Sequence, residues 1–268
     1  MKTLLMLTVL LTMIKASGQD TIRFDKNGKK VSTERAYSYR VLTRESSLFR
    51  IAEYYLNGNF RMTGYCCISG IPDATDSLLK QGPFCYFDEQ GNLTSQGFYD
   101  HDKKAGKWKT FFPGRSLYFE QTYDRKSQLD GKFTVYYPDG KIKREDTYKQ
   151  GTLREKHCYS LTGRDTTWFP FYIAPVYNGG DAAQIKFQAE NTVYPIAARK
   201  NGIQGIVYLS FFVGMDGKVE AVEILKGVYK LLDEEAIRVV SNMPPWKPGF
   251  QDGKPARIQV ILPFLFRL

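Results

Sequence analysis

A repeated pattern of glycine and aromatic residues in the middle of the chain constrains its fold more than any other feature. Three blocks begin with a glycine, continue with spaced aromatic residues and then reach a second glycine, where a turn is expected; they start 24 and 25 residues apart. This period predicts one β-hairpin per repeat, and neighbouring hairpins must pair into a long antiparallel sheet because an isolated hairpin is only marginally stable. The blocks are residues 82–87, 106–113 and 131–138, and the turn glycines are Gly91, Gly114, Gly140 and Gly163.

The repeat blocks resemble MORN-type repeats, in the variant found in secreted bacterial proteins. That resemblance implies a β-sheet scaffold, in some members a protein-binding surface, and no chemistry. Residues 36–68 contain the turn signal Asn57-Gly58 and are expected to form further, degenerate hairpins, whereas residues 70–79 are expected to be a loop. We expect the aromatic side chains to fill the sheet core, with a recognition face as the alternative. These residues are Trp108, Phe112, Phe133 and Tyr137.

The N-terminus has the order of a secretory signal peptide. Lys2 precedes an apolar run over residues 4–14, and the small residues Ala16, Ser17 and Gly18 follow. This run is shorter than the roughly 20 residues that a membrane span requires. Residues 1–18 are therefore predicted to be a cleaved signal, with an uncleaved segment as the alternative, and the protein is predicted to be periplasmic.

The formal net charge of +10 does not indicate a nucleic-acid partner. Removal of residues 1–18 takes away Lys2 and Lys15 and leaves 36 basic against 28 acidic residues, a net +8. The remaining excess is spread along the chain without the dense basic run that phosphates require. Nucleic acid is therefore not expected among the partners.

After residue 175 the hydrophobic pattern changes from strand hairpins to mixed helices and strands. Asp181 is placed to cap the first helix, and Pro263 would put the last strand at a sheet edge because proline cannot donate to a ladder. The predicted order is helix, helix, strand, strand, helix, strand, with one antiparallel sheet covered by helices on one face. The expected elements are residues 180–190, 195–202, 206–213, 218–225, 231–243 and 256–266.

Six short motifs follow one another in this region: Tyr194-Pro195-x-x-Ala198, Gly202-Ile203-x-Gly205-x-Val207, Asp216-Gly217-Lys218-Val219, Leu232-Asp233-x-Glu235-Ala236, Met243-Pro244-x-Trp246-x-Pro248-Gly249 and Gly253-Lys254-Pro255. Together they resemble the TonB C-terminal domain family in the form common in Bacteroidetes. The sequence as a whole thus predicts an α+β protein, with a MORN-like β-hairpin repeat sheet over residues 19–170 and a TonB-like domain over residues 172–268. We interpret the motif residues as structural, because they set turns and the core. They include Tyr194, Pro195, Gly202, Gly205, Asp216, Gly217, Trp246 and Pro248.

The TonB resemblance implies a protein-recognition module that captures the TonB box, a short extended segment of an outer-membrane transporter. An extended peptide can add a strand to an exposed sheet edge, where backbone hydrogen bonds give affinity and alternate side chains give specificity. An edge protected against aggregation by polar side chains is the alternative. The predicted partner-binding edge strand is Arg257, Ile258, Gln259, Val260 and Ile261.

The chain departs from a complete energy transducer, because its 12 prolines are scattered and a folded repeat region stands where a Pro-rich spacer would be. The prediction is therefore a periplasmic adaptor that binds outer-membrane transporters. The alternative is a structural scaffold of the cell envelope in which the repeat sheet carries the interaction. Contact with the inner-membrane transduction complex and formation of a homodimer both remain open.

No constellation of residues predicts an enzyme, a cofactor or a metal site. His101 and His157 lack a second ligand at metal spacing. Cys66, Cys67, Cys85 and Cys158 include no C-x-x-C pair, and adjacent Cys66 and Cys67 would point to opposite faces of a sheet, so one disulfide at most is expected.

Overall fold

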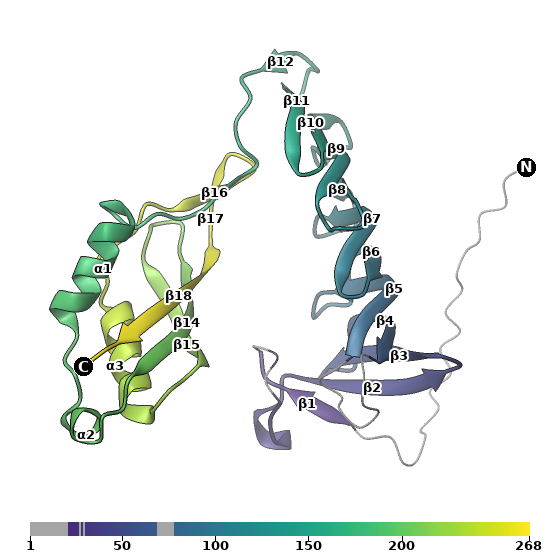
Figure 1. Ribbon diagram of the computed structural model, residues 1–268. Helices are drawn as coiled ribbons and strands as arrows, with labels where there is room; N and C mark the ends of the chain where they lie inside the picture. Colours follow the sequence, from purple (N-terminus) through teal and green to yellow (C-terminus); the bar gives the residue numbers. More distant parts are fainter. Residues whose placement is uncertain (1–20, 27, 29, 69–77) are drawn as a thin grey trace, which may run out of the picture. The chain divides into compact units, whose positions relative to one another are not determined.

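The structure is a computed structural model that describes residues 21–26, 28, 30–68 and 78–268 (Figure 1). The predicted signal peptide, residues 1–18, lies outside the described residues. The chain divides into two compact units, one ending at Trp168 and one running from Phe169 to Leu268. Within the described residues, no helix has the length and apolar character needed to cross a membrane.

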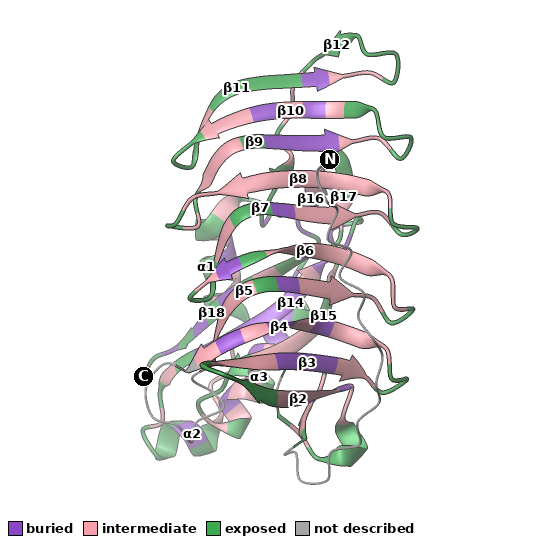
Figure 2. Cartoon of the chain, turned by 90° about the vertical axis from the view of Figure 1, so that its right-hand side faces the viewer, coloured by how far each residue is buried: buried purple, intermediate pink, exposed green. Residues whose placement is uncertain are grey.

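The first unit is one long antiparallel sheet whose twelve strands follow each other in sequence order, as Figure 2 shows. Each strand therefore pairs with its neighbours in the chain, which is the arrangement that stacked hairpins require. A short 3-10 helix, Thr33–Arg35, precedes the second strand. The strands are β1 Ile22–Phe24, β2 Ser38–Glu45, β3 Leu48–Tyr55, β4 Phe60–Ile68, β5 Leu78–Phe87, β6 Leu93–Asp100, β7 Lys103–Phe111, β8 Leu117–Tyr123, β9 Leu129–Tyr136, β10 Ile142–Lys149, β11 Thr152–Tyr159 and β12 Asp165–Thr166.

The predicted repeats coincide with the hairpins β5–β6, β7–β8 and β9–β10. Their first glycines, Gly82, Gly106 and Gly131, lie inside the strands with φ between +61° and +114°, a region that favours glycine. The expected loop over residues 70–79 was wrong at its end. Leu79 belongs to β5, where it pairs with Cys67, because the apolar pattern continues upstream of the glycine. The rest of that loop, up to residue 77, lies outside the described residues.

Aromatic rings in this single-layer sheet are buried by lying over glycines of the neighbouring strand. The Trp108 side chain is 3% exposed, and a Cβ added at Gly97 would overlap its indole ring. Phe84 covers Gly64 in the same way one repeat earlier. The Trp108 indole N–H donates to the carbonyl of Phe98 at 3.0 Å, so the ring is fixed as well as buried. Trp108 and Phe133 (4% exposed) thus fill the sheet core as expected, whereas Phe112 and Tyr137 are half-buried.

A buried ion network joins the first hairpins on the same face. The Glu53 side chain is 0% exposed and accepts hydrogen bonds from Ser38, Arg40 and Arg61. Burial by itself would raise the pKa of the Glu53 carboxyl, but these donors outweigh burial and hold the pKa below its ordinary value. A buried carboxylate needs such donors, so the network fixes the register of β2, β3 and β4.

The second unit places one three-stranded sheet against helices and adds a second, smaller sheet (Figure 1). The larger sheet has the order β15-β14-β18 and the smaller one β13-β16-β17. The elements are β13 Tyr172–Ile173, α1 Gly180–Asn191, α2 Ile196–Lys200, β14 Gly205–Val213, β15 Val219–Lys226, α3 Lys230–Ser241, β16 Gly249–Gln251, β17 Lys254–Ala256 and β18 Ile258–Phe266.

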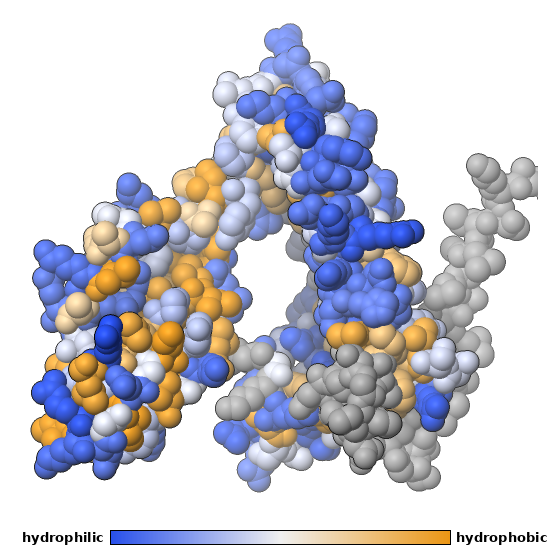
Figure 3. Space-filling view, in the orientation of Figure 1, coloured by the Kyte–Doolittle hydropathy of each residue, from blue (hydrophilic) through white to orange (hydrophobic). Residues whose placement is uncertain are grey.

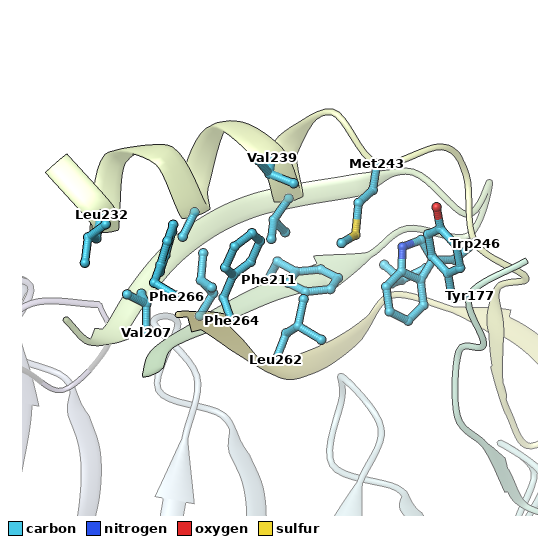
Figure 4. Packing of buried hydrophobic residues seen from close by; sticks show 14 of the residues in the cluster. Tyr177, Val207, Phe211, Leu232, Val239, Met243, Trp246, Leu262, Phe264 and Phe266 are labelled. Atoms are coloured by element: carbon cyan, nitrogen blue, oxygen red, sulfur yellow. The ribbon is translucent and has the colours of Figure 1, made fainter. Parts of the chain in front are cut away.

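The core of this unit lies between α3 and the larger sheet, where Figure 4 shows side chains from both sides meeting. Every second residue of β14, such as Phe211, faces α3, and Leu232 and Val239 of α3 face the sheet with 0% exposure. Their spacing in the chain matches the helical period, and this explains why the helix forms there. At one end of the core, Trp246 meets the rings of Tyr177 (5.3 Å between centroids) and Phe211 (5.5 Å).

Two sequence expectations for this unit were wrong. Asp181 does not cap α1, because the helix already begins at Gly180, and Gly179, in a left-handed conformation, occupies the N-cap position. Ala256 does not belong to the last strand, because it pairs with Gly249 in the smaller sheet. That sheet was not predicted, although Asp252-Gly253 at its hairpin turn is a dipeptide typical of turns.

We expect Gly97→Ala to destabilise the repeat unit by about 1–3 kcal/mol, because the added methyl group overlaps the Trp108 ring. Urea denaturation followed by circular dichroism measures the change. In a Trp108→Leu background the same substitution should cost much less, since the overlapping ring is gone. An equal cost in both backgrounds would show that the ring does not restrict this position.

We expect Glu53→Gln to lower stability at pH 7 by about 3–5 kcal/mol, because two guanidinium groups lose their buried counter-charge. The pKa of Glu53 is lower in the folded state than in the unfolded state. The stability that its carboxylate contributes is therefore present above the unfolded pKa of about 4.3 and is lost as pH falls through the folded pKa.

The stability difference between the wild type and Glu53→Gln should thus shrink on acidification, which thermal melts between pH 7 and pH 3 measure. Glu45→Gln serves as the control, because Glu45 forms an exposed pair with Arg50 and its loss should cost less than about 1 kcal/mol. A difference that is constant over this pH range would contradict the assignment.

Candidate peptide-binding edge

Strand β18 forms one edge of the larger sheet in the second unit. It pairs along its whole length with β14, from Ile258 opposite Val213 to Phe266 opposite Gly205. Within the described part of the chain no strand lies on its other side. Pro263 lies within this strand, as expected for an edge, because a proline in a central strand would remove a ladder hydrogen bond.

The side chains of β18 alternate between the core and the outer face. Ile258 (7% exposed) and Leu262 (8%) are buried. Leu262 and, in part, Val260 pack against the core cluster that includes α3 and β14, so they anchor the strand there. Gln259 and Ile261 lie on the outer face, where Ile261 is 61% exposed. The Gln259 amide donates to the Ser210 hydroxyl of β14 at 2.6 Å. This contact directs the amide toward β14, the side of β18 opposite the free edge.

Arg257 was predicted to belong to the edge strand, and the structure corrects this. It lies between β17 and β18, because Ala256 still pairs with β16 and the strand begins only at Ile258. Its guanidinium group lies 3.5 Å from the centroid of the Phe212 ring and donates to the Glu220 carboxylate at 2.7 Å. Arg257 thus spans the outer face of the sheet at the start of the edge.

The outer face of this sheet carries exposed apolar side chains next to the edge. Figure 3 shows hydrophobic surface, in orange, on this unit. Tyr208 and Ile206 on β14 lie opposite Pro263 and Leu265 on β18. Leu265 is 61% exposed. A strand added beside β18 would therefore meet an apolar row on one of its two faces.

The first group of motif residues shapes the segment between α1 and β14. The Tyr194 ring meets Phe266 edge-on at 5.8 Å, and its hydroxyl donates to the Ile203 carbonyl at 2.6 Å. Pro195 occupies the N-cap position of α2, Gly202 follows that helix, and Gly205 begins β14. These four motif residues thus lie where they fix turns and element ends.

The second group connects the hairpin turn to Trp246. The backbone N–H of Trp246 donates to the backbone carbonyl of Gly217 at 2.8 Å, and a Cβ at Gly217 would collide with the backbone carbonyl of Trp246. Gly217 also has φ +84°, so both space and conformation require glycine. Asp216 accepts the Lys218 N–H at 3.1 Å and closes the turn, and Pro248 leads from Trp246 into β16.

No cluster of candidate metal ligands occurs among the described residues. The nearest pairing that involves a histidine is His101 with Asp100 at 2.7 Å, on an exposed turn. None of the four cysteines forms a disulfide among the described residues, and burial raises the pKa of Cys66 to about 11. A thiol with that pKa is protonated at neutral pH and is a poor nucleophile.

Comparison with known proteins finds two families along the chain. Residues 190–268 match the model of the Gram-negative bacterial TonB protein C-terminal family, and residues 80–101 and 129–150 match the MORN repeat variant. No significant match was found among curated proteins.

Two solved structures show similarity. The solution structure of the Helicobacter pylori TonB C-terminal domain (residues 194–285) is 22% identical, with a TM-score of 0.26; the match covers 32% of this chain and 91% of that one. A crystal structure of the GtfA/B complex bound to UDP and GlcNAc is 12% identical, with a TM-score of 0.22, and the match covers 48% of this chain and 27% of that one. Residues 190–268 are thus similar to the TonB C-terminal family, and the hairpin sheet of the first unit contains two segments that are similar to the MORN repeat variant.

Proposed function

We propose that residues 172–268 bind an extended TonB-box-like segment of an outer-membrane transporter by strand addition to β18. The protein would be exported to the periplasm with loss of residues 1–18, would have no enzymatic activity, and would use the repeat region, residues 19–170, as a spacer or second docking surface. The observation that carries this proposal is the free edge of β18, a nine-residue strand paired on one side. The TonB family match over residues 190–268 supports it.

The position of Pro263 indicates which backbone groups face an incoming strand. In an antiparallel pair, alternate residues direct their N–H and C=O groups to one neighbour, and the residues between them direct theirs to the other side. A proline is tolerated where its missing N–H would face the free edge. Gln259 and Ile261 precede Pro263 by four and two residues, so their backbone groups point to the same side of the strand as those of Pro263. We therefore assign these groups to the added strand.

The position of Pro263 also makes the first half of β18 a better binding site for an added strand than the second half. Pro263 offers a carbonyl and no N–H, so a regular ladder with a partner would be interrupted there. Ahead of it, Gln259 and Ile261 each offer both groups. The exposed Ile261 side chain would contact apolar side chains on the outer face of an added strand, and this contact would favour an alternating, partly apolar peptide.

We expect Gln259→Pro to weaken peptide binding at least about tenfold, because it removes one outward N–H and obstructs the ladder, while the pairing with β14 is retained. Calorimetric titration of the full chain with a synthetic peptide that contains a TonB-box-like segment measures the dissociation constant.

Gln259→Ala is the matched control, because it removes the side-chain contact with Ser210 but keeps the backbone N–H; affinity should stay within about threefold. Circular dichroism verifies that both variants are folded. Unchanged affinity of Gln259→Pro in a folded protein would exclude strand addition at this edge. If deletion of residues 172–268 left transporter-dependent growth unchanged, the scaffold function of the repeat region would be favoured instead.

A further inference from the structure

Two lysines in the repeat unit lie over aromatic rings on the same face of the sheet. The Lys80 ammonium group is 4.8 Å from the centroid of the Tyr99 ring, and that of Lys104 is 4.4 Å from the Trp108 ring. The Tyr99 and Trp108 rings are themselves in contact, with centroids 4.9 Å apart. Both cations therefore belong to one continuous aromatic cluster.

Neither ammonium group has a carboxylate partner among the described residues. The polar contact of the Lys80 ammonium is the Tyr86 hydroxyl at 3.2 Å, and Asp102 accepts only the backbone N–H of Lys80. Burial lowers the pKa of Lys104, and the charge of Lys80 lowers it further. These two cations thus repel each other on a partly buried surface, and an anion between them would relieve that repulsion.

The opposite face of the same strands is arranged differently. Lys107 of β7 pairs with Glu120 at 3.0 Å, and Lys132 of β9 pairs with Glu145 at 2.9 Å. These lysines are exposed and neutralised across the strand pair, as expected for a solvated surface. Lys80 and Lys104 differ from these two lysines in lying over aromatic rings, with no carboxylate partner among the described residues.

A pocket of about 390 Å³ lies next to Lys80 and is also lined by residues of β2, β3 and β4. Lys80 and Tyr86 line it together with Arg40, Arg61 and Glu53. Because Glu53 already accepts hydrogen bonds from both arginines, its charge is offset and the pocket retains an excess of positive charge. A volume of this size suits a small polar ring such as one sugar residue.

Lys80 and Lys104 occupy the same position in two successive repeats. Lys80 precedes Gly82 by two residues, and Lys104 precedes Gly106 by two, so the two lysines occupy equivalent positions on β5 and β7. Equivalent positions two strands apart are separated by about 9.6 Å, since neighbouring strands are about 4.8 Å apart. The third repeat has Leu129 at this position, and there the row of equivalent lysines ends.

We propose that this face of the repeat sheet binds an acidic polysaccharide, with carboxylates at Lys80 and Lys104 and one sugar residue in the pocket beside Lys80 and Tyr86. Polar groups beside aromatic rings suit a hydroxylated, anionic ring. A linear peptide fits less well, because strands β5 and β7 are paired on both sides and offer no free backbone edge. This inference is independent of the function proposed for β18.

The test is affinity electrophoresis of the full chain in gels that contain polygalacturonate, with dextran as the neutral polymer and poly-L-glutamate as the acidic peptide. We expect retardation by polygalacturonate and little by the other two. Lys80→Met with Lys104→Met should weaken binding at least about tenfold, because both charges are removed while the apolar stems remain on the rings.

Lys107→Met with Lys132→Met is the matched control, since it removes the same charge from the opposite face; its affinity should change less than about threefold. Equal losses in both double variants, or equal retardation by poly-L-glutamate, would overturn the proposal, as would no retardation of the wild type. If the first double variant does not fold, the affinity of the Leu129→Lys variant for polygalacturonate provides the test instead. Tighter binding from this third cation supports the proposal, and unchanged affinity contradicts it.

Discussion

A single-layer sheet has no second layer to cover its apolar side chains, and this constraint governs the repeat unit. Its rings must be buried by neighbouring strands of the same sheet, which is why Trp108 and Phe84 lie over Gly97 and Gly64. Each hairpin consequently depends on the next one for its core, and the sheet is stable as a stack. Lysine and arginine side chains such as Lys80, Lys104 and Arg40 contribute to the same burial. Their apolar stems cover the aromatic rings, while their charged ends stay near solvent.

The C-terminal unit meets the requirement for burial in another way, with α3 across one face of a short sheet. The opposite face and the β18 edge are then left without a covering element among the described residues. The contact between Gly217 and Trp246 connects the β14–β15 turn to the segment that leads into the small sheet and β18. The edge is thus held by the core, and Gln259 and Ile261 are presented on a strand whose alternate side chains, including Leu262, Phe264 and Phe266, are buried.

Much of this architecture could be predicted from the sequence, because strand and helix periods depend on local patterns. Local sequence patterns indicated the repeat glycines, the apolar face of α3 and the position of Pro263 in an edge strand. The smaller sheet was missed because its strands have two or three residues each, too few for a period, and the Asp252-Gly253 signal was overlooked. The lack of a carboxylate beside Lys80 among the described residues and the network around Glu53 could not be predicted, because they depend on the exact register of neighbouring strands, which the repeat pattern does not fix. The same holds for Arg257, whose contacts with Glu220 and Phe212 take it away from the free edge.

The two units offer chemically different surfaces for recognition. A terminal strand such as β18 has unused backbone groups, which any extended peptide can satisfy, so its selectivity must come from neighbours such as Ile261. Central strands such as β5 and β7 have no unused backbone groups, and a ligand on their face can be selected only by side chains. Strand addition therefore suits the TonB-like unit, while recognition by charged side chains suits the repeat unit. The two proposed ligands, an extended peptide and an acidic polymer, would thus be recognised through different chemical groups.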